Sequence, residues 1–461
     1  MWIVDELLEA TQGELLRGDP ACGVSGITID SRRLRSGEAF VAIQGARFDG
    51  HAFLDEAARR GASCFIVAQA YAGGISSSLT LPTIVVPDTV RALGDLARFH
   101  RRRLGKVVIS VTGSCGKTTT KDLIAHLLGN HGTVLKNAGT QNNQIGVPLT
   151  LLRLLPEHDV AVVELGSNHP GEIAYLSSIA EPNMAVITNI GPAHLEFFGS
   201  LMGVLHEKLS VLERLASDGT AILPGDQLDV CLHAPRLLSP QARIVTFGTN
   251  ERCDLHAVDA QPVREGMCFH MHDHPRAWHV PLVGYHNVEN TLAAVACVWA
   301  FGIPLTLARE RLASFSPLPL RSQVVKCNGW TILNDCYNAN PLSCARALET
   351  LRDLPVRRRL AILGDMLELG SCAPLAHQAM GRLAAQWGVE QVIAVGQYAS
   401  CVAQGVHEAR ANGVSTYRTV QELLEQLPGL LQPGDGLLVK GSRRLNLEQV
   451  AELLIQKSSQ E

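Results

Sequence analysis

The sequence lacks a long hydrophobic run and a strong charge of either sign. Across its 461 residues, no uninterrupted apolar stretch approaches the ~18 residues that a membrane-spanning helix needs. The formal net charge is −4 and the pI is near 6.5. Such a chain has no overall basic field to hold nucleic acid or an anionic membrane surface. We therefore expect no integral membrane segment and no nucleic-acid partner.

Paired cysteines and a secretion signal are also missing. The twelve cysteines are scattered without any CxxC pair, and the opening MWIVDELLEA has neither a basic n-region nor an apolar h-region. Free thiols in a reducing cytosol are the expectation, and with them a cytoplasmic protein. Hydrophobic residues make up 46% of the chain and charged residues 18%, which is ordinary for a globular protein.

Length and pattern predict three domains, at roughly 150 residues per domain. Residues 1–86 mix one helical stretch, residues 4–16, with short segments punctuated by glycine, and predict a small α/β domain. Residues 87–316 open with a helix over 88–103, for which Asp88 is the expected N-cap. Residues 317–461 form the third domain.

The second and third domains both show buried strands that alternate with helices. Apolar segments at 107–111, 160–165 and 184–190, and again at 331–335, 360–365, 392–396 and 437–442, predict parallel sheets covered on both faces. Short alternating strands between about 253 and 283 predict a β insert, and a helix follows around 287–300. No G-x-G-x-x-G follows a strand of the last domain, so its Rossmann-like pattern has no dinucleotide fingerprint.

A phosphate-binding loop follows the strand at 107–111. The segment TGSCGKTT (112–119) lies between this strand and the helical stretch KDLIAHLL, so backbone N–H groups and a helix N-terminus would converge on an anion. Lys117 would reach the β and γ phosphates, and Thr118 would offer a hydroxyl to Mg²⁺. The strict consensus requires glycine where this chain has Val111, so Gly113 stands in for it. The predicted ligand is ATP or GTP, and the central domain is expected to be a P-loop parallel-sheet ATPase domain.

Two polar residues stand at the ends of neighbouring strands. Glu164 ends the buried strand VAVVE, where a carboxylate without a binding partner would cost too much free energy to bury. His194 follows the next strand, at the edge where open α/β sheets bind ligands. A lone histidine there is more often a satisfied loop residue, but its place in a row of strand-end polar groups favours a ligand.

Several longer stretches resemble the Mur ligase family of peptidoglycan synthesis, and the resemblance covers nearly the whole chain. The loop TGSCGKTT is similar to the family's TGSSGKT or TGTNGKT loop. Four further stretches resemble the branch that adds D-alanyl-D-alanine: NNQIGVPLTLLRL (142–154), ELGSNHPGEI (164–173), DCYNANPLS (335–343) and GDMLELG (364–370). The stretch DSRRLRSGEAFVAIQGARFDGHAF (30–53) is similar to the family's UDP-binding N-terminal domain.

The resemblance implies an ATP- and Mg²⁺-dependent ligase of three α/β domains. Residues 1–86 would bind the UDP substrate, 87–316 ATP, and 317–461, Rossmann-like, the amino acid or dipeptide. The implied reaction joins D-alanyl-D-alanine to UDP-N-acetylmuramoyl-tripeptide through an acyl phosphate, as the last cytoplasmic step of precursor synthesis. We expect a monomer.

The resemblance also assigns residues. The implied catalytic set is Lys117, Glu164, His194, Lys208 and Arg321. Metal ligands would be Thr118 and Glu164 for one Mg²⁺ and His194 for another, with Lys208 matching a lysine that some members carry as a carbamate. ATP would be bound by Gly113, Ser114, Cys115, Gly116, Lys117, Thr118, Thr119, Asn287, Asn290, Arg321, Asp335, Tyr337 and Asn338. The sugar-peptide substrate would meet Ser31, Arg32, Asn142 and Asn143.

Plainer interpretations stay open for several of these residues. Lys208 fits a solvated helix lysine, Asn287 a helix N-cap, and the DSR segment at 30–32 an Asx turn or a loop ion pair. The run FHMHDH would place His270, His272 and His274 on one strand face as a metal-binding comb, but nearby glycine and proline favour an exposed hairpin.

The sequence departs from the family pattern at four places. Cys115 replaces Ser or Asn in the phosphate loop, Cys336 replaces Ser in DCYNAN, Leu320 stands where glycine commonly precedes the arginine, and Ser210 stands where an acidic residue is frequent. Two rival functions remain: another ligase of the same superfamily, and a P-loop ATPase that couples hydrolysis to binding a partner.

Overall fold

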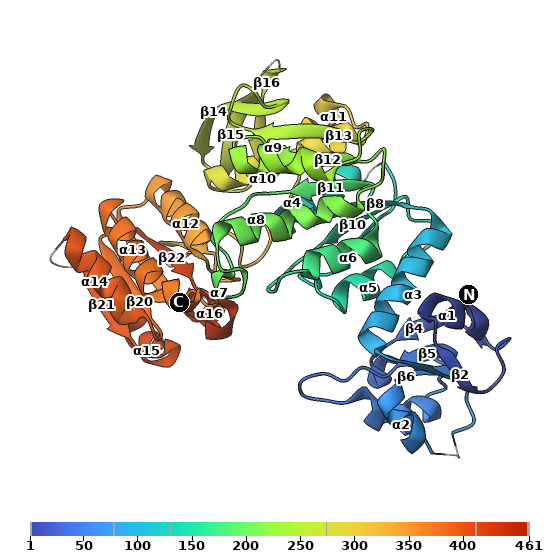
Figure 1. Cartoon of the computed structure of the whole chain (residues 1–461). Helices are drawn as coiled ribbons and strands as arrows, with labels where there is room; N and C mark the ends of the chain where they lie inside the picture. The colour runs from blue at the N-terminus through green and yellow to red at the C-terminus, as the bar shows by residue number, and fades with distance from the viewer. Residues whose placement is uncertain (1, 77–78, 130, 273, 411–412, 459–461) are drawn as a thin grey trace. The chain divides into compact units, whose positions relative to one another are not determined.

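The computed structural model describes residues 2–76, 79–129, 131–272, 274–410 and 413–458 (Figure 1). These residues form three main sheets, of five, nine and six strands, together with a two-stranded pair. The predicted α/β class with a sheet for each of three domains is confirmed. The chain packs into two compact units, Met1–Ser110 with Gly132–Leu165 and Ala174–Pro182, and Val111–His131 with Gly166–Ile173 and Asn183–Glu461. The domain boundaries at 86/87 and 316/317 stay predictions.

The first sheet has the strand order β2-β7-β6-β5-β4. Its strands are β2 (Glu14–Arg17), β4 (Gly26–Thr28), β5 (Glu38–Val41), β6 (Cys64–Ala68) and β7 (Thr83–Val86). Only β2 runs antiparallel to its neighbour. Beside the sheet are α1 (Val4–Thr11), α2 (Leu54–Arg59) and the pair β1 (Trp2–Ile3) and β3 (Gly23–Val24). Buried apolar side chains of β5 and β6, including Phe40 and Phe65, form the core on one face.

The helix predicted over 4–16 is wrong in its second half. Helix α1 ends at Thr11, Gln12 takes the left-handed conformation at φ 52°, and the following residues form β2. A Cβ on Gly13 would lie 2.7 Å from Ile84 of β7, so glycine permits the close approach of the two strands. Pairing of β2 with β7 therefore overrides the helical spacing of the local sequence.

Helix α3 (Thr89–Leu104) follows this sheet, and its predicted N-cap is confirmed. The Asp88 carboxylate accepts hydrogen bonds from the backbone N–H groups of Val90 and Arg91. Gly94 on the helix faces Tyr175 and Ile179 of α6 (Glu172–Ala180), where a Cβ would lie 2.6 Å from the tyrosine oxygen. Glycine thus lets these two helices pack closely. Helix α5 (Gly146–Leu151) also contacts α3.

The second sheet has the order β16-β15-β14-β13-β12-β11-β8-β10-β9. Its strands are β8 (Val107–Thr112), β9 (Val134–Lys136), β10 (Val160–Glu164), β11 (Met184–Ile187), β12 (Thr220–Pro224), β13 (Arg243–Gly248), β14 (Leu255–Val263), β15 (Gly266–Met271) and β16 (His274–Val280). Strands β14, β15 and β16 run antiparallel to one another and correspond to the predicted β insert. The predicted strands at 107–111, 160–165 and 184–190 correspond to β8, β10 and β11.

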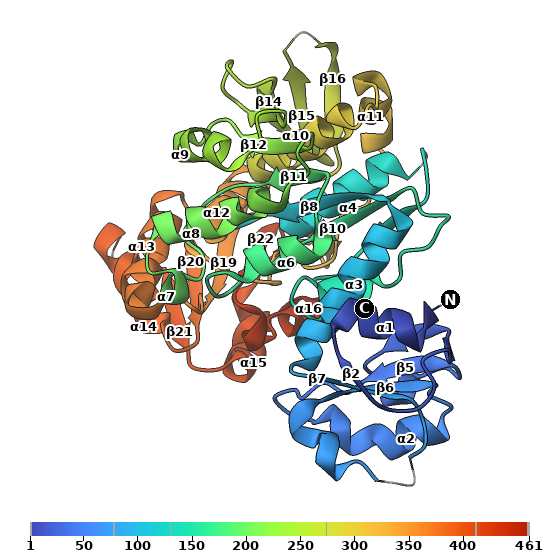
Figure 2. The same ribbon diagram turned by 45° about the vertical axis from the view of Figure 1, so that its right-hand side comes forward.

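Helices α4 (Lys117–Leu128) and α10 (Tyr285–Ala300) lie side by side against this sheet (Figure 2). Both are buried along most of their length; α10 is mainly apolar, whereas α4 also buries the polar residues 118–122. The other helices of this region are α7 (Leu195–Phe198), α8 (Leu201–Leu209), α9 (Leu228–His233) and α11 (Leu305–Leu312). The pairing of α4 with α10 places the start of α10 beside the phosphate loop.

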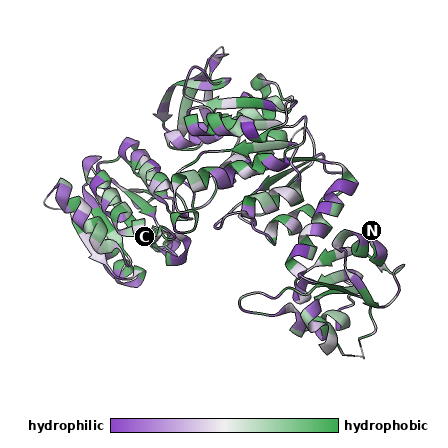
Figure 3. Ribbon diagram, in the orientation of Figure 1, coloured by the Kyte–Doolittle hydropathy of each residue, from purple (hydrophilic) through white to green (hydrophobic). Residues whose placement is uncertain are grey.

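The third sheet has the order β17-β18-β22-β19-β20-β21 and is parallel except for β17. Its strands are β17 (Gln323–Cys327), β18 (Trp330–Asn334), β19 (Arg358–Gly364), β20 (Gln391–Val395), β21 (Val414–Tyr417) and β22 (Asp435–Lys440). Its helices are α12 (Pro341–Asp353), α13 (Ala373–Gln386), α14 (Ala399–Ala409), α15 (Val420–Leu430) and α16 (Glu448–Ser458). The strands are mainly hydrophobic (Figure 3). Within the described part of the chain, no helix has the length and apolarity to cross a membrane.

Candidate functional site

The phosphate loop joins β8 to α4 and depends on two glycines with positive φ. Gly113 has φ 139° and Gly116 φ 80°. A Cβ on Gly113 would lie 2.1 Å from the Thr188 hydroxyl, and one on Gly116 would lie 2.0 Å from Oδ1 of Asn290. Neither position has room for a side chain, so the backbone itself lines the loop.

We expect Gly116→Ala to weaken nucleotide binding at least 10-fold, because the methyl group must push Asn290 away or unwind the loop. Titration with a fluorescent ATP analogue measures the effect. Gly105→Ala is the matched control, since Gly105 also has positive φ, 61°, but has no atom within 4 Å of its Cβ position. Equal losses in both variants would mean that backbone strain, and not the contact with Asn290, causes the effect.

Residues after β11 hold the other side of the loop. The Asn189 side chain accepts from the Cys115 N–H at 3.0 Å and donates to the Cys115 carbonyl at 3.1 Å. The Ser114 hydroxyl donates to the Gly191 carbonyl and accepts from the Gly191 N–H, both at 2.9 Å. These four hydrogen bonds anchor the loop through the Cys115 backbone and the Ser114 hydroxyl, and tolerance of a cysteine at position 115 stays a prediction.

Lys117 starts α4 and folds back over the loop. Its Nζ donates to the Gly113 carbonyl at 2.7 Å. Thr118 and Thr119 are buried in the first turn of the helix. An ammonium group, a hydroxyl and the N-terminus of a 12-residue helix thus meet at one place, which is the chemistry that a polyphosphate needs.

Asn287 and Asn290 lie on one face of α10, as their spacing predicts. The Asn290 amide donates to Oδ1 of Asn287 at 3.0 Å, and both side chains are buried. The alternative that Asn287 caps the helix is wrong, because the helix begins at Tyr285 and the Asn287 amide donates back to the Val283 carbonyl.

Lys208 is buried and is not the solvated helix lysine that remained an alternative. Only 1% of the residue is exposed, and its Nζ donates to the Ser167 hydroxyl at 2.6 Å. Burial, assisted by the charge of Lys117, lowers the pKa of Lys208 to about 7. Nearby, the Glu207 carboxylate accepts from the N–H groups of Gly171 and Ile173, at 2.7 and 2.8 Å. A buried amine that is partly neutral at physiological pH is a reactive group.

His194 lies just before α7 with φ 53°. Its Nδ1 donates a hydrogen bond to the carboxylate of Glu368, which follows β19 in the C-terminal region. This hydrogen bond lowers the pKa of Glu368, against the opposing effect of burial. The ring of Phe198 meets His194 edge to face and lies 5.4 Å from Nζ of Lys208. Phe198 therefore joins His194 and Lys208 into one cluster.

Glu164 ends β10 with 1% of its surface exposed. Oε1 of its carboxylate accepts from the Asn142 amide at 2.7 Å, and its backbone pairs with the Asn137 side chain. Asn143 instead accepts from the backbone N–H groups of Ile145 and Gly146 at the start of α5, at 3.2 and 2.9 Å. Asn142 thus orients the Glu164 carboxylate, whereas the Asn143 side chain is hydrogen-bonded to the backbone at the start of α5.

The DSR segment forms a short turn in the first domain. Asp30 accepts from the backbone N–H of Arg32 and pairs with its guanidinium through two bonds of 2.9 Å. The Ser31 hydroxyl donates to Glu56 at 3.1 Å. Both the Asx turn and the ion pair that were alternatives for this motif are present. The Arg32 side chain is 79% exposed, so it remains open to a ligand.

The third sheet brings together residues on either side of its first two strands: Arg321 before β17, and Asp335, Tyr337 and Asn338 after β18. The Arg321 guanidinium lies 4.0 Å from the centre of the Tyr337 ring. Leu320 before it has φ 61°, a backbone conformation that favours glycine. One Asp335 oxygen accepts from the Ser322 N–H, and the other pairs with Lys440 at 2.9 Å.

Three further residues of this site were not predicted from the sequence: Lys440, Asn340 and Glu368. Lys440 is buried at the end of β22 and donates to the Asn338 carbonyl at 2.6 Å. Burial opposes its charge, but Asp335 raises the pKa of Lys440 overall. Asn340 caps α12 and meets the Cys115 thiol at 3.3 Å. A charge at the end of a buried strand, the signal used for Glu164, would also have found Lys440.

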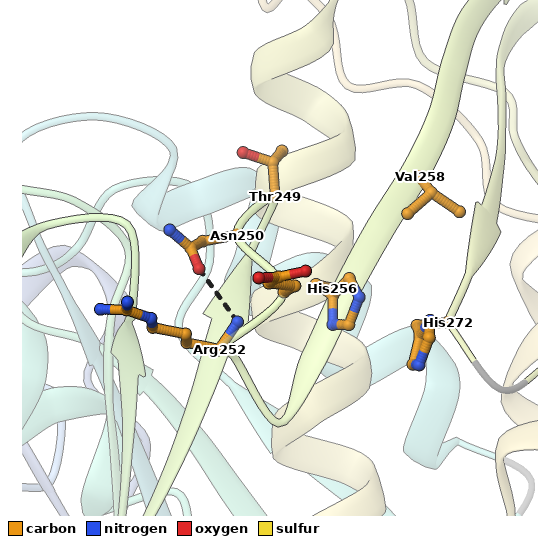
Figure 4. Close-up of a pocket in the computed structure, with 7 residues that line it drawn as sticks. Thr249, Asn250, Arg252, His256, Val258 and His272 are labelled. Carbon is orange, nitrogen blue, oxygen red and sulfur yellow. Dashed lines mark hydrogen bonds between the residues drawn. The ribbon is translucent and has the colours of Figure 1, made fainter.

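The alternative metal-binding comb of His270, His272 and His274 is not arranged on one strand. β15 ends at Met271 and His274 begins β16, so the three histidines do not share one strand; Asp273 lies outside the described residues. His272 stacks on His256 beside an open hollow of about 710 Å³ (Figure 4). The hollow is lined by Thr249, Asn250, Glu251, Arg252, His256, Val258 and His272. None of these belongs to the predicted site.

Comparison with known proteins agrees with this geometry. Residues 111–298 match the Mur ligase middle domain, 320–443 the Mur ligase glutamate ligase domain, and 23–101 the Mur ligase family catalytic domain. The UDP-N-acetylmuramoyl-tripeptide–D-alanyl-D-alanine ligase of Escherichia coli (strain K12) is 35% identical over 98% of both chains.

Solved structures extend the similarity to the fold. A crystal structure of MurF from Acinetobacter baumannii has a TM-score of 0.90 and 32% identity, over 99% of both chains. The MurF ligase of Thermotoga maritima, solved in complex with ADP, has a TM-score of 0.84 and 27% identity over 94% of this chain and 98% of that one. With this similarity in both sequence and fold over nearly the full length, the chain belongs to the Mur ligase family.

Proposed function

We infer that the protein is an ATP-dependent ligase that joins D-alanyl-D-alanine to UDP-N-acetylmuramoyl-tripeptide in peptidoglycan precursor synthesis. The observation that supports this most strongly is full-length similarity to ligases of this name, together with the intact phosphate cradle. ATP is the proposed nucleotide. A cytoplasmic location and a monomeric state are part of the proposal, and twelve free cysteines fit a reducing compartment.

The chemistry follows from the poor reactivity of a carboxylate. Its leaving group would be oxide, so the terminal carboxylate of the tripeptide attacks the γ-phosphorus of ATP, and ADP leaves. The resulting acyl phosphate is attacked by the amine of D-alanyl-D-alanine. A tetrahedral intermediate forms and collapses with loss of phosphate, leaving an amide bond.

Lys117 is proposed to neutralise the transferring phosphoryl group, because its ammonium lies over the loop. Arg321 supplies a second positive charge, and the Tyr337 ring orients its guanidinium. Asn287 and Asn290 are proposed to contact adenine, and Asp335, Tyr337 and Asn338 the ribose and base. Ser31, Arg32, Asn142 and Asn143 are proposed to contact the sugar-peptide substrate.

Mg²⁺ is the proposed metal. Among the described residues, no three His, Cys, Asp or Glu side chains gather as a ready-made ion site. Mg²⁺ commonly takes only one or two carboxylates and completes its shell with phosphate oxygens and water. The carboxylate of Glu164 and the hydroxyl of Thr118 have the oxygen chemistry that Mg²⁺ takes, so we propose them as ligands of the first ion. His194 and a carbamoylated Lys208 are proposed for a second ion. When bound, the metal would withdraw charge from the phosphate oxygens.

The test is phosphate release from ATP and Mg²⁺, with the tripeptide substrate and D-alanyl-D-alanine added singly and together. We expect release only with both, and a product heavier by the dipeptide less water. Release without either substrate would favour an ATPase that acts on a partner. Release only with a different acceptor or amino acid would favour another ligase of the superfamily.

A further inference from the structure

The motif GDMLELG at 364–370 has no part in the proposed mechanism, yet the structure brings one of its side chains to the cluster of His194. The Glu368 carboxylate is bonded to Nδ1 of the imidazole. The main chains meet as well, because the Glu196 N–H donates to the Glu368 carbonyl at 3.2 Å. Two separate hydrogen bonds therefore join the loop after β19 to His194 and to the first turn of α7.

Both residues of the pair adopt a backbone conformation that non-glycine residues avoid. Glu368 has φ 62° and His194 has φ 53°. Such conformations persist when the surrounding structure over-determines them, and they gather at functional sites. Gly370, at φ 54°, packs its backbone against Glu196, where a Cβ would lie 3.3 Å from Cα. The loop is thus shaped to bring this one carboxylate to this one imidazole.

The bond also fixes the chemistry of the ring. A carboxylate only accepts, so Nδ1 carries a proton in this bond, and in the neutral ring Nε2 then keeps its lone pair. In protein metal sites, a ligating histidine usually donates its other N–H to such a partner, which sets its tautomer and orientation.

We propose that Glu368 is a positioning residue, which holds His194 in the Nδ1-protonated tautomer so that Nε2 is free to bind a divalent cation. This inference rests on the proposed function only in giving His194 the role of a ligand. It also makes the C-terminal region a contributor to the metal site.

The first experiment reads the tautomer directly, in enzyme without metal or nucleotide. Long-range ¹H–¹⁵N spectra of histidine-labelled protein report both ring nitrogens, and the His194→Gln variant identifies the signal. We expect the Nδ1–H form in the wild type and a shift toward the Nε2–H form in Glu368→Ala. Glu196→Ala, which removes an exposed carboxylate nearby, is the matched control and should keep the Nδ1–H form. An unchanged tautomer in Glu368→Ala would overturn the proposal.

The second experiment measures affinity for Mn²⁺ as a probe of the cation site, by electron paramagnetic resonance with ADP present. Loss of such a partner commonly weakens metal binding 10- to 100-fold, and we expect a loss in that range for Glu368→Ala. Glu368→Gln keeps an acceptor oxygen in place and should restore most of the affinity. If Glu368→Ala does not fold, Glu368→Asp replaces it, because its shorter side chain should give a mixture of tautomers; the pure wild-type form would count against the proposal. Failure of the proposed function would instead appear as a wild type that makes no amide product.

Discussion

Replacing Lys117 with methionine is expected to lower kcat/KM by at least 100-fold while leaving the fold intact. The side chain lies over the phosphate loop, where its Nζ is 2.7 Å from the Gly113 carbonyl. Methionine keeps the length of the side chain but removes the charge that opposes the approach of a carboxylate to a phosphate. Loss of one preorganised electrostatic group typically costs a factor of about 10² to 10³. Coupled measurement of ADP formation with both substrates present tests the expectation.

Two further variants separate charge from shape. Lys117→Arg should also lose activity, because the planar guanidinium is bulkier than an ammonium and cannot make the same point contact with the Gly113 carbonyl. Lys106→Met is the control for loss of a positive charge in general, since Lys106 is partly exposed and bonds only the Pro156 carbonyl among the contacts described. Activity of Lys117→Met within 3-fold of the wild type would rule out a charge-neutralising role.

The parts of the fold and site that the sequence predicted are those encoded locally. Continuous apolar strands, the Asp88 cap and the phosphate loop each depend on residues close together in the chain. The position of Glu164 at the buried end of β10 was predicted for the same reason, and its role as a metal ligand stays a prediction. The Asn287 and Asn290 pair followed from helical spacing alone.

What was missed depends on partners far away in sequence. The end of α1 at Thr11 depends on β2 pairing with β7, about seventy residues later. Lys440 bonds the carbonyls of Asp335 and Asn338, more than a hundred residues away, and the bond between Glu368 and His194 spans 174 residues. No local periodicity contains such pairs. The sequence does mark Lys440, as a charge at the end of a buried strand, and Glu368, as a charge in the motif GDMLELG. Neither signal identifies the residue that each one contacts.

Lys208 is expected to be a site where activity and stability oppose one another. Its pKa of about 7 lies well below that of a lysine in the unfolded chain, because burial disfavours the ammonium form. Between about pH 7 and pH 10.5 the unfolded chain therefore binds more protons than the folded protein. Lys208 therefore makes the free energy of unfolding increase as pH rises through that window, and its destabilisation of the folded state is largest at low pH. Lys208→Met should remove the cost and raise Tm at pH 8 by roughly 2 to 4 °C, while activity falls at least 100-fold.

The same neutral amine is the form that reacts with CO₂. Its Nζ lone pair attacks the carbon, an N–C bond forms as one C=O π bond breaks, and a proton is released, so that a cation becomes a carboxylate. The Ser167 hydroxyl, 2.6 Å away, is placed to bond that group. We expect a carbamate signal from ¹³C-labelled bicarbonate at pH 8 that disappears in Lys208→Met, and lower activity in buffers stripped of CO₂. Wild-type activity that ignores CO₂, with no carbamate signal, would mean that the buried amine acts unmodified. The rise of Tm in Lys208→Met would still be expected in CO₂-free buffer, because it follows from burial of the amine near the charge of Lys117.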